Sequence, residues 1–212
     1  MNKNKSLSAY LWSLNEDLAK ASLHSIFVQG IKTGNLPLEN FQEYIAQDAY
    51  FLDAFAKGYG LAIAKSNNRY EIRILSELLA GVVEELSLHD QYSAKWDVDL
   101  NEKSLGESTL NYIDFLLSTA SIGTIKEIIS AMVPCLKLYS WIGKELNQDR
   151  DLNNPYNEWI NTYGSPSFEE LSLKLESLLN NSTKREGEAN IEFIYRRAMK
   201  LELNFFQSNS PQ

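Results

Sequence analysis

The feature that most constrains the fold of this chain is a hydrophobic period of three to four residues that persists over most of its length. Apolar residues at this spacing lie on one side of an α-helix, whereas strict alternation of apolar and polar residues would predict a β-strand. No stretch alternates strictly enough to predict a sheet, and only five prolines and ten glycines interrupt the 212 residues. We therefore predict an all-α fold.

The periodic segments predict eight helices, at 6–30, 38–66, 69–94, 107–119, 123–148, 155–163, 167–181 and 186–208. Pro37 lies at the start of the second predicted helix, and Ser167 lies at the start of the seventh. Proline and serine are both enriched at the N-terminal ends of helices. The Asn- and Asp-rich segment 148–155 predicts a loop, and the polar tail after Phe206 is expected to fray. Because no repeat or long linker divides the chain, we expect one domain over residues 1–212, an irregular bundle whose site forms between facing helices.

Composition narrows the class of protein. The formal net charge is −8, and lysines and arginines form no cluster, which argues against a nucleic-acid binder. The chain has a single cysteine, so no intrachain disulfide can form, as is usual in a reducing cytoplasm. No segment approaches 18 uninterrupted apolar residues and no signal-peptide pattern opens the chain, so we expect a cytoplasmic protein without a membrane partner.

Cys135 lies on the apolar face of its predicted helix, directly after Pro134. The other members of this face recur at helical spacing and are Ile125, Ile128, Met132, Tyr139, Ile142 and Leu146. A lone buried cysteine is most often an inert small hydrophobic residue, but an inward thiol can also be a nucleophile. The residues by themselves leave both interpretations open.

Two carboxylates also point inward. Asp48 shares a helix face with Tyr44, Phe51 and Phe55, where it either completes a structural hydrogen bond or accepts one from a polar ligand. Glu202 lies on the apolar face of the last helix. Burial should raise its pKa, as suits a general acid, unless a Lys or Arg from another helix pairs with it.

Two further tyrosines, Tyr112 and Tyr163, could stack on a ligand and bond it through their hydroxyls, although most tyrosines in such positions simply pack in the core.

Four short motifs follow one another in an order that is more specific than any one of them. They are Phe27-Val-Gln-Gly-Ile31 to Gly34-Asn-Leu-Pro37, with Phe41 and Tyr44-Ile-Ala-Gln-Asp48-Ala-Tyr-Phe-Leu52; Pro134-Cys135 with Tyr139 and Gly143; Trp159-Ile-Asn-Thr-Tyr163; and Glu202 with Phe205 and Phe206. They resemble the TenA family of thiaminase II enzymes, and the resemblance extends from about residue 10 to residue 206.

The resemblance implies a heme-oxygenase-like helical fold, a homotetramer, and neither metal nor heme nor another cofactor. It implies hydrolysis of 4-amino-5-aminomethyl-2-methylpyrimidine to the hydroxymethyl pyrimidine and ammonia, and cleavage of thiamin as a further activity. The implied catalytic residues are Cys135, Glu202 and Asp48, and the implied substrate-binding residues are Asp48, Phe51, Tyr112, Tyr139, Tyr163 and Phe205.

The sequence departs from the family pattern at two positions. Phe51 stands where the family usually has a tyrosine, and Ser25, preceded by His24, stands where a histidine is common. Three other classes of protein stay under consideration. A heme oxygenase would need an axial ligand such as His24; a di-iron oxidase would need more than His24 and the Glu85–His89 pair; and a non-catalytic pyrimidine-binding or regulatory protein would fit the loss of a hydroxyl at Phe51.

Overall fold

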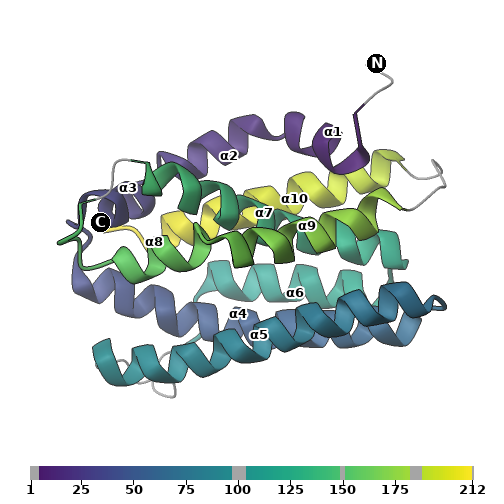
Figure 1. The fold of residues 1–212 in the computed structure, drawn as a ribbon, viewed down its shortest axis with the longest axis horizontal. Helices are drawn as coiled ribbons and strands as arrows, with labels where there is room; N and C mark the ends of the chain where they lie inside the picture. The colour runs from purple at the N-terminus through teal and green to yellow at the C-terminus, as the bar shows by residue number, and fades with distance from the viewer. Residues whose placement is uncertain (1–4, 97–103, 149–150, 182–187, 212) are drawn as a thin grey trace.

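A computed structural model describes residues 5–96, 104–148, 151–181 and 188–211. Figure 1 shows these residues as a bundle in which the axes of the longer helices are roughly parallel to one another. The helices are α1 (Leu7–Ser13), α2 (Glu16–Leu23), α3 (Ile26–Thr33), α4 (Leu38–Lys65), α5 (Arg69–Trp96), α6 (Glu107–Ile122), α7 (Ile125–Asn147), α8 (Asn157–Tyr163), α9 (Pro166–Asn180) and α10 (Glu188–Ser208). The described residues contain no strand, and the predicted all-α fold is confirmed.

The prediction of one continuous helix over 6–30 is wrong, because this segment forms three short helices. Polar side chains interrupt it by competing for backbone hydrogen bonds. The Asn15 amide donates to the Leu11 carbonyl oxygen at 2.8 Å, at the junction of α1 and α2. Ser25 then caps α3, its hydroxyl accepting a bond from the Val28 N–H at 3.3 Å.

Two other predicted helix ends also move. The N-cap of α9 is Ser165, with Pro166 at the first helical position, so the helix starts one residue before the predicted Ser167. The tail after Phe206 continues as helix to Ser208, and Asn209 is buried. The Asn209 side-chain amide donates to the Phe205 carbonyl oxygen at 2.8 Å. The backbone carbonyl oxygen of Asn209 accepts a hydrogen bond from the Asn40 side chain. The expected fraying is therefore absent at 207–210, since this backbone is tied to the core.

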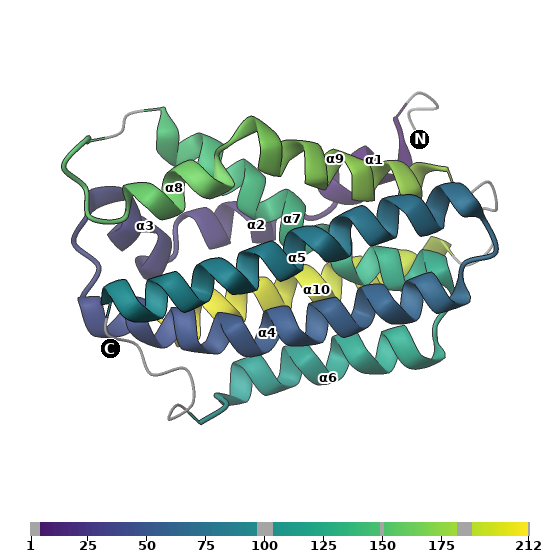
Figure 2. The ribbon, with the colours of Figure 1, turned by 60° about the horizontal axis from the view of Figure 1, so that its bottom comes forward.

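The scaffold of the bundle is a long hairpin of α4 and α5 facing α7. Figure 2 shows α4 and α5 side by side over most of their length, with α6 along the other flank of α4. Helix α7 packs on α10, α9 and α8 and also contacts α4. The interior is rich in rings, and its most deeply buried large side chains include Tyr44, Tyr59, Tyr112, Tyr195, Phe27, Phe55 and Phe206. Each buried ring contributes stabilisation by removing apolar surface from water.

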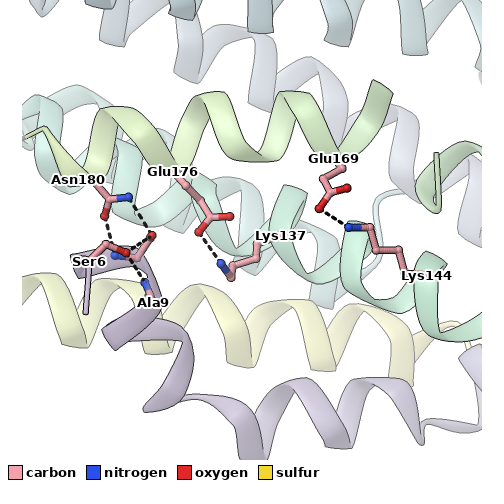
Figure 3. A network of polar contacts seen from close by, with 8 residues as sticks. Ser6, Ala9, Lys137, Lys144, Glu169, Glu176 and Asn180 are labelled. Atoms are coloured by element: carbon pink, nitrogen blue, oxygen red, sulfur yellow. Dashed lines mark hydrogen bonds and ion pairs between the residues drawn. The ribbon is translucent and has the colours of Figure 1, made fainter. Parts of the chain in front are cut away.

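Helix α9 is fastened to α7 and α1 by polar contacts along one side (Figure 3). Lys137 of α7 pairs with Glu176, and Lys144 of α7 pairs with Glu169. Near the end of α9, Asn180 accepts a bond from the Ser8 N–H at 2.9 Å. These contacts fix the position of the helix that carries two cavity-lining residues, Phe168 and Leu171.

Over the described part of the chain, no helix combines the length and the apolar character needed to cross a bilayer.

Candidate active site

A largely apolar cavity opens where the α4–α5 hairpin faces α7, with α8 and α9 completing its wall. Most of its lining is aliphatic or aromatic, with a few polar groups among them, which is the usual composition of a small-molecule site. The lining residues are Asp48, Phe51, Leu52, Phe55, Tyr59, Leu78, Gly81, Val82, Glu85, Cys135, Leu136, Tyr139, Tyr163, Phe168 and Leu171.

Cys135 reaches this cavity from α7 and is partly exposed there, while most of its helical neighbours are buried. Burial raises the pKa of the Cys135 thiol well above its ordinary value, and the charges of Glu202, Asp48 and Glu85 raise it further. These carboxylates disfavour a second negative charge. The resting residue is therefore a neutral thiol, which must lose its proton when it reacts.

Glu202 lies behind Cys135, outside the cavity lining, and is 1% exposed. Its carboxyl lies close enough to the Cys135 side chain for the two groups to influence each other's pKa, and the Tyr112 hydroxyl donates to its Oε1 at 2.7 Å. Burial raises the pKa of Glu202 to about 8, against the opposing effect of the Tyr112 bond. Among the described residues no Lys or Arg pairs with it, so it carries a proton at neutral pH.

Asp48 lines the cavity from α4 and is 4% exposed. Its charge adds to the effect of burial in raising the pKa of Tyr44, Tyr139 and Cys135. Asp48 therefore lies within electrostatic reach of the thiol and of the tyrosines on the neighbouring helices.

Tyr139 and Tyr163 form one aromatic wall. Their ring centroids are 4.8 Å apart in an edge-to-face arrangement. The close approach of α7 and α8 that brings them together depends on Gly143, where an added Cβ would lie 2.4 Å from the Gly164 nitrogen. Behind this wall the Tyr44 hydroxyl bonds the Tyr139 hydroxyl at 3.3 Å and accepts a bond from the Trp159 indole at 3.2 Å. The network fixes the orientation of Tyr139.

Phe51 forms the second aromatic wall, backed by two of the predicted binding residues. The Tyr112 ring lies 4.6 Å from the Phe51 ring, and the Phe205 ring lies 6.3 Å from it. Neither Tyr112 nor Phe205 lines the cavity. Of the predicted site residues, the structure brings to the cavity surface Asp48, Phe51, Cys135, Tyr139 and Tyr163, and it places behind them Glu202, Tyr112 and Phe205.

Two cavity residues with polar groups, Tyr59 and Glu85, are not among the site residues that the sequence predicts. Tyr59 continues the α4 face four residues after Phe55, a spacing that was available in the sequence. Its buried hydroxyl has no hydrogen-bond partner among the described residues. The spacing of four residues between Glu85 and His89 is typical of a surface pair, but Glu85 lines the cavity together with Leu78 and Val82, at helical spacings of four and three. The side chain of His89 lies outside the described residues.

The two positions near the end of α2 do not take part in the cavity. His24 is exposed, and its Nδ1 bonds the Lys20 carbonyl oxygen at 2.7 Å. Ser25 caps α3. His24 is therefore not placed to ligate a group bound in this cavity.

Solved structures define the class of protein to which this fold belongs. The heme oxygenase of Leptospira interrogans superposes with a TM-score of 0.67 at 15% identity, over 96% of this chain and 100% of that one. A TenA family transcription regulator from Silicibacter superposes with a TM-score of 0.90 at 25% identity, over 96% of each chain. The fold is that of the heme-oxygenase-like helical bundles, as predicted.

The particular family follows from the sequence. The model of the TENA/THI-4/PQQC family matches residues 15–211, and the chain belongs to this family. Its relatives include the mitochondrial bifunctional TH2 protein of Arabidopsis thaliana, which is 35% identical over 96% of this chain. This chain spans only 37% of the length of that protein. The aminopyrimidine aminohydrolase of Halalkalibacterium halodurans is 29% identical over 95% of this chain and 94% of the relative. The aminopyrimidine aminohydrolase of Staphylococcus saprophyticus is 31% identical over 86% of this chain and 84% of the relative.

Proposed function

We propose that this protein is an aminopyrimidine aminohydrolase of the thiaminase II type. The observation that carries the proposal is Cys135 at an aromatic cavity, next to the buried carboxyl of Glu202, whose pKa is raised to about 8. A thiol nucleophile beside a protonated acid suits addition to an electron-poor aromatic ring. Relatives similar over most of this chain carry the name aminopyrimidine aminohydrolase.

In the proposed reaction the substrate is 4-amino-5-aminomethyl-2-methylpyrimidine, lying between Phe51 and the Tyr139–Tyr163 wall. The Cys135 sulfur forms a bond to a ring carbon while its proton passes to Asp48. Glu202 gives its proton to a ring nitrogen, which makes the ring a better electrophile.

The ring electrons of this adduct then expel the amine from the exocyclic methylene carbon. The substituent enters as an ammonium, so its nitrogen takes the C–N electron pair and leaves as neutral ammonia. Water adds to the same carbon and releases one proton to solvent, where the ammonia takes it up. Loss of Cys135 from the ring restores aromaticity, and the protons return to Cys135 and Glu202. The net change is one water consumed and one ammonia released.

The remaining predicted residues have supporting roles in this scheme. Asp48 also orients the 4-amino group of the substrate. Tyr112 holds Glu202 through the 2.7 Å bond, and Phe205 backs the Phe51 ring. Thiamin carries the same pyrimidine with a different leaving group, and we propose its cleavage as a second activity of the same site.

The test is incubation of the purified protein with the aminomethyl pyrimidine and with thiamin, followed by chromatography. We expect the hydroxymethyl pyrimidine as product, with one ammonia per turnover of the aminomethyl substrate. Binding of the pyrimidine without any turnover would favour the second candidate, a pyrimidine-binding or regulatory protein. The observation that favours this second candidate is Phe51, because a phenylalanine gives its wall of the cavity no hydroxyl to bond a substrate.

We further propose that the chain acts as one domain over residues 1–212, in the cytoplasm, as a homotetramer. The exposed apolar side chains Ile122 (88%) and Phe193 (62%) support this assembly, because subunit contacts bury apolar surface.

A further inference from the structure

Glu85 is the carboxylate of the cavity that the reaction scheme above does not use. It extends from α5, on a different wall from Cys135 on α7. Asp48 is another acidic residue of the lining, and the lining residues within the described part of the chain include no lysine, arginine or histidine. A cavity with acidic groups and apolar walls concentrates a negative potential and attracts cations.

A hydrogen bond from the aromatic wall fixes Glu85. The Tyr163 hydroxyl donates to Glu85 Oε1 at 2.8 Å. The Tyr163 ring in turn packs against Tyr139 and Phe168, with centroids 4.8 Å and 5.0 Å away. A carboxylate held by a packed donor loses little additional rotamer freedom when it binds a ligand.

The charge of Glu85 is felt inside the cavity. It contributes to the raised pKa of the Cys135 thiol and of the Tyr59 and Tyr163 hydroxyls. Glu85 is half-buried and borders the cavity itself, so a ligand positioned to react with Cys135 lies within range of its carboxylate.

We propose that Glu85 binds the cationic leaving group of the substrate, so that the cavity selects pyrimidines whose exocyclic substituent carries a positive charge. The inference rests on the proposed function of this cavity. An aminomethyl group is an ammonium near neutral pH, whereas the hydroxymethyl group of the product is neutral. Glu85 therefore distinguishes substrate from product by charge.

This assignment fits the bond changes of the reaction. When the C–N bond breaks, its electron pair goes to the nitrogen, and an ammonium substituent leaves as neutral ammonia without taking a proton from the protein. The attraction to Glu85 disappears with the positive charge. Neither the departing ammonia nor the hydroxymethyl product is then retained by it.

The experiment compares two ligands in one pair of variants. Dissociation constants for the aminomethyl and hydroxymethyl pyrimidines are measured by calorimetry at about pH 7, in a Cys135→Ser background that preserves the substrate. We expect Glu85→Gln to weaken the aminomethyl ligand about tenfold, as for loss of one partly exposed charge pair. The hydroxymethyl ligand should change less than about twofold. Glu84→Gln is the matched control, because Glu84 is the adjacent residue of α5 and is exposed.

Equal weakening of both ligands by Glu85→Gln would overturn the proposal, since Glu85 would then only maintain the shape of the cavity. An unchanged aminomethyl affinity would overturn it as well. Tyr163→Phe should reduce the preference for the cation in the same direction as Glu85→Gln, because it removes the bond that holds the carboxylate.

The two levels of proposal fail separately. If the wild-type protein hydrolyses the aminomethyl pyrimidine but Glu85→Gln leaves the ligand preference intact, only the role of Glu85 is wrong. If the protein binds the cation preferentially through Glu85 but turns nothing over, the role stands and the hydrolase function does not. If it binds neither pyrimidine, both are wrong.

Discussion

The Tyr112 hydroxyl donates a 2.7 Å hydrogen bond to Glu202 Oε1, and each residue is only 1% exposed. The bond connects α6 to α10 at a point where Glu202 also meets Cys135 of α7. Burial outweighs the bond in setting the pKa of Glu202, which is raised to about 8. The pair therefore holds a protonated acid in a fixed position directly behind the thiol.

Replacing Cys135 by serine tests the nucleophile. Cys135→Ser should retain the fold and ligand binding, because the side chains are similar in size, but should lose most turnover, because a hydroxyl is a much weaker nucleophile here. The measurement is steady-state turnover beside calorimetric binding. Substrate should also protect Cys135 of the wild-type protein from alkylation, as followed by mass spectrometry. Full activity in Cys135→Ser would rule out the covalent mechanism.

Glu202→Gln tests the acid. The amide keeps the shape and the bond from Tyr112 but cannot supply the proton, so turnover should fall by about two to four orders of magnitude. In the wild-type protein kcat/KM should decrease as the pH rises through about 8, where Glu202 loses its proton. Substrate affinity should change much less. Near-normal turnover in the variant would show that Glu202 is structural.

The raised pKa of Glu202 also predicts how stability depends on pH. In the unfolded chain this carboxyl ionises near 4.5, and in the folded protein near 8. Between these values the folded state binds more protons, so its contribution is fully present below about pH 4.5 and is lost as the pH rises to about 8. The loss is on the order of a few kcal/mol.

Urea unfolding at about pH 5 and about pH 8 measures this effect. The wild-type protein should lose more unfolding free energy between the two pH values than Glu202→Gln, which has no proton to release at this position. The comparison cancels other titrating groups. Equal losses in the two proteins would mean that Glu202 ionises alike in the folded and unfolded states.

Phe51→Tyr tests the wall of the cavity that lacks a hydroxyl. Phe51 lines the cavity one turn from Asp48 and packs on Tyr112. The added hydroxyl should change kcat/KM, while the unfolding free energy should stay within about 1 kcal/mol if the hydroxyl reaches a polar partner. Kinetics and chemical denaturation measure the two effects. Strong destabilisation with loss of activity would mean that the new hydroxyl is buried without a partner.

The proposed homotetramer is tested by measuring the mass of the protein in solution. A homotetramer should give about four times the 24.2 kDa chain mass in light scattering at micromolar concentration. Replacing an exposed apolar side chain such as Phe193 by a charged residue would shift the mass downwards if this surface is a subunit contact. A monomer mass for the wild-type protein would contradict the tetramer.

Local periodicity was enough to predict several features of this protein. The helical spacing of apolar residues predicted the all-α fold and the long helices α4, α5 and α7. The same spacing predicted that Asp48 and Glu202 are buried and that Cys135 lies on the apolar face of α7. These properties depend on neighbours three and four residues away, which the sequence displays directly.

The tertiary structure decided which inward residues meet. Cys135 and Glu202 come from helices that are far apart in the sequence, and their contact depends on how α7 and α10 pack rather than on any local pattern. The breaks at Asn15 and Ser25 follow from side-chain to backbone bonds that compete with a helical period that would otherwise continue. The place of Glu85 in the cavity was decided in the same way, because the helix that carries it must first pack against α4.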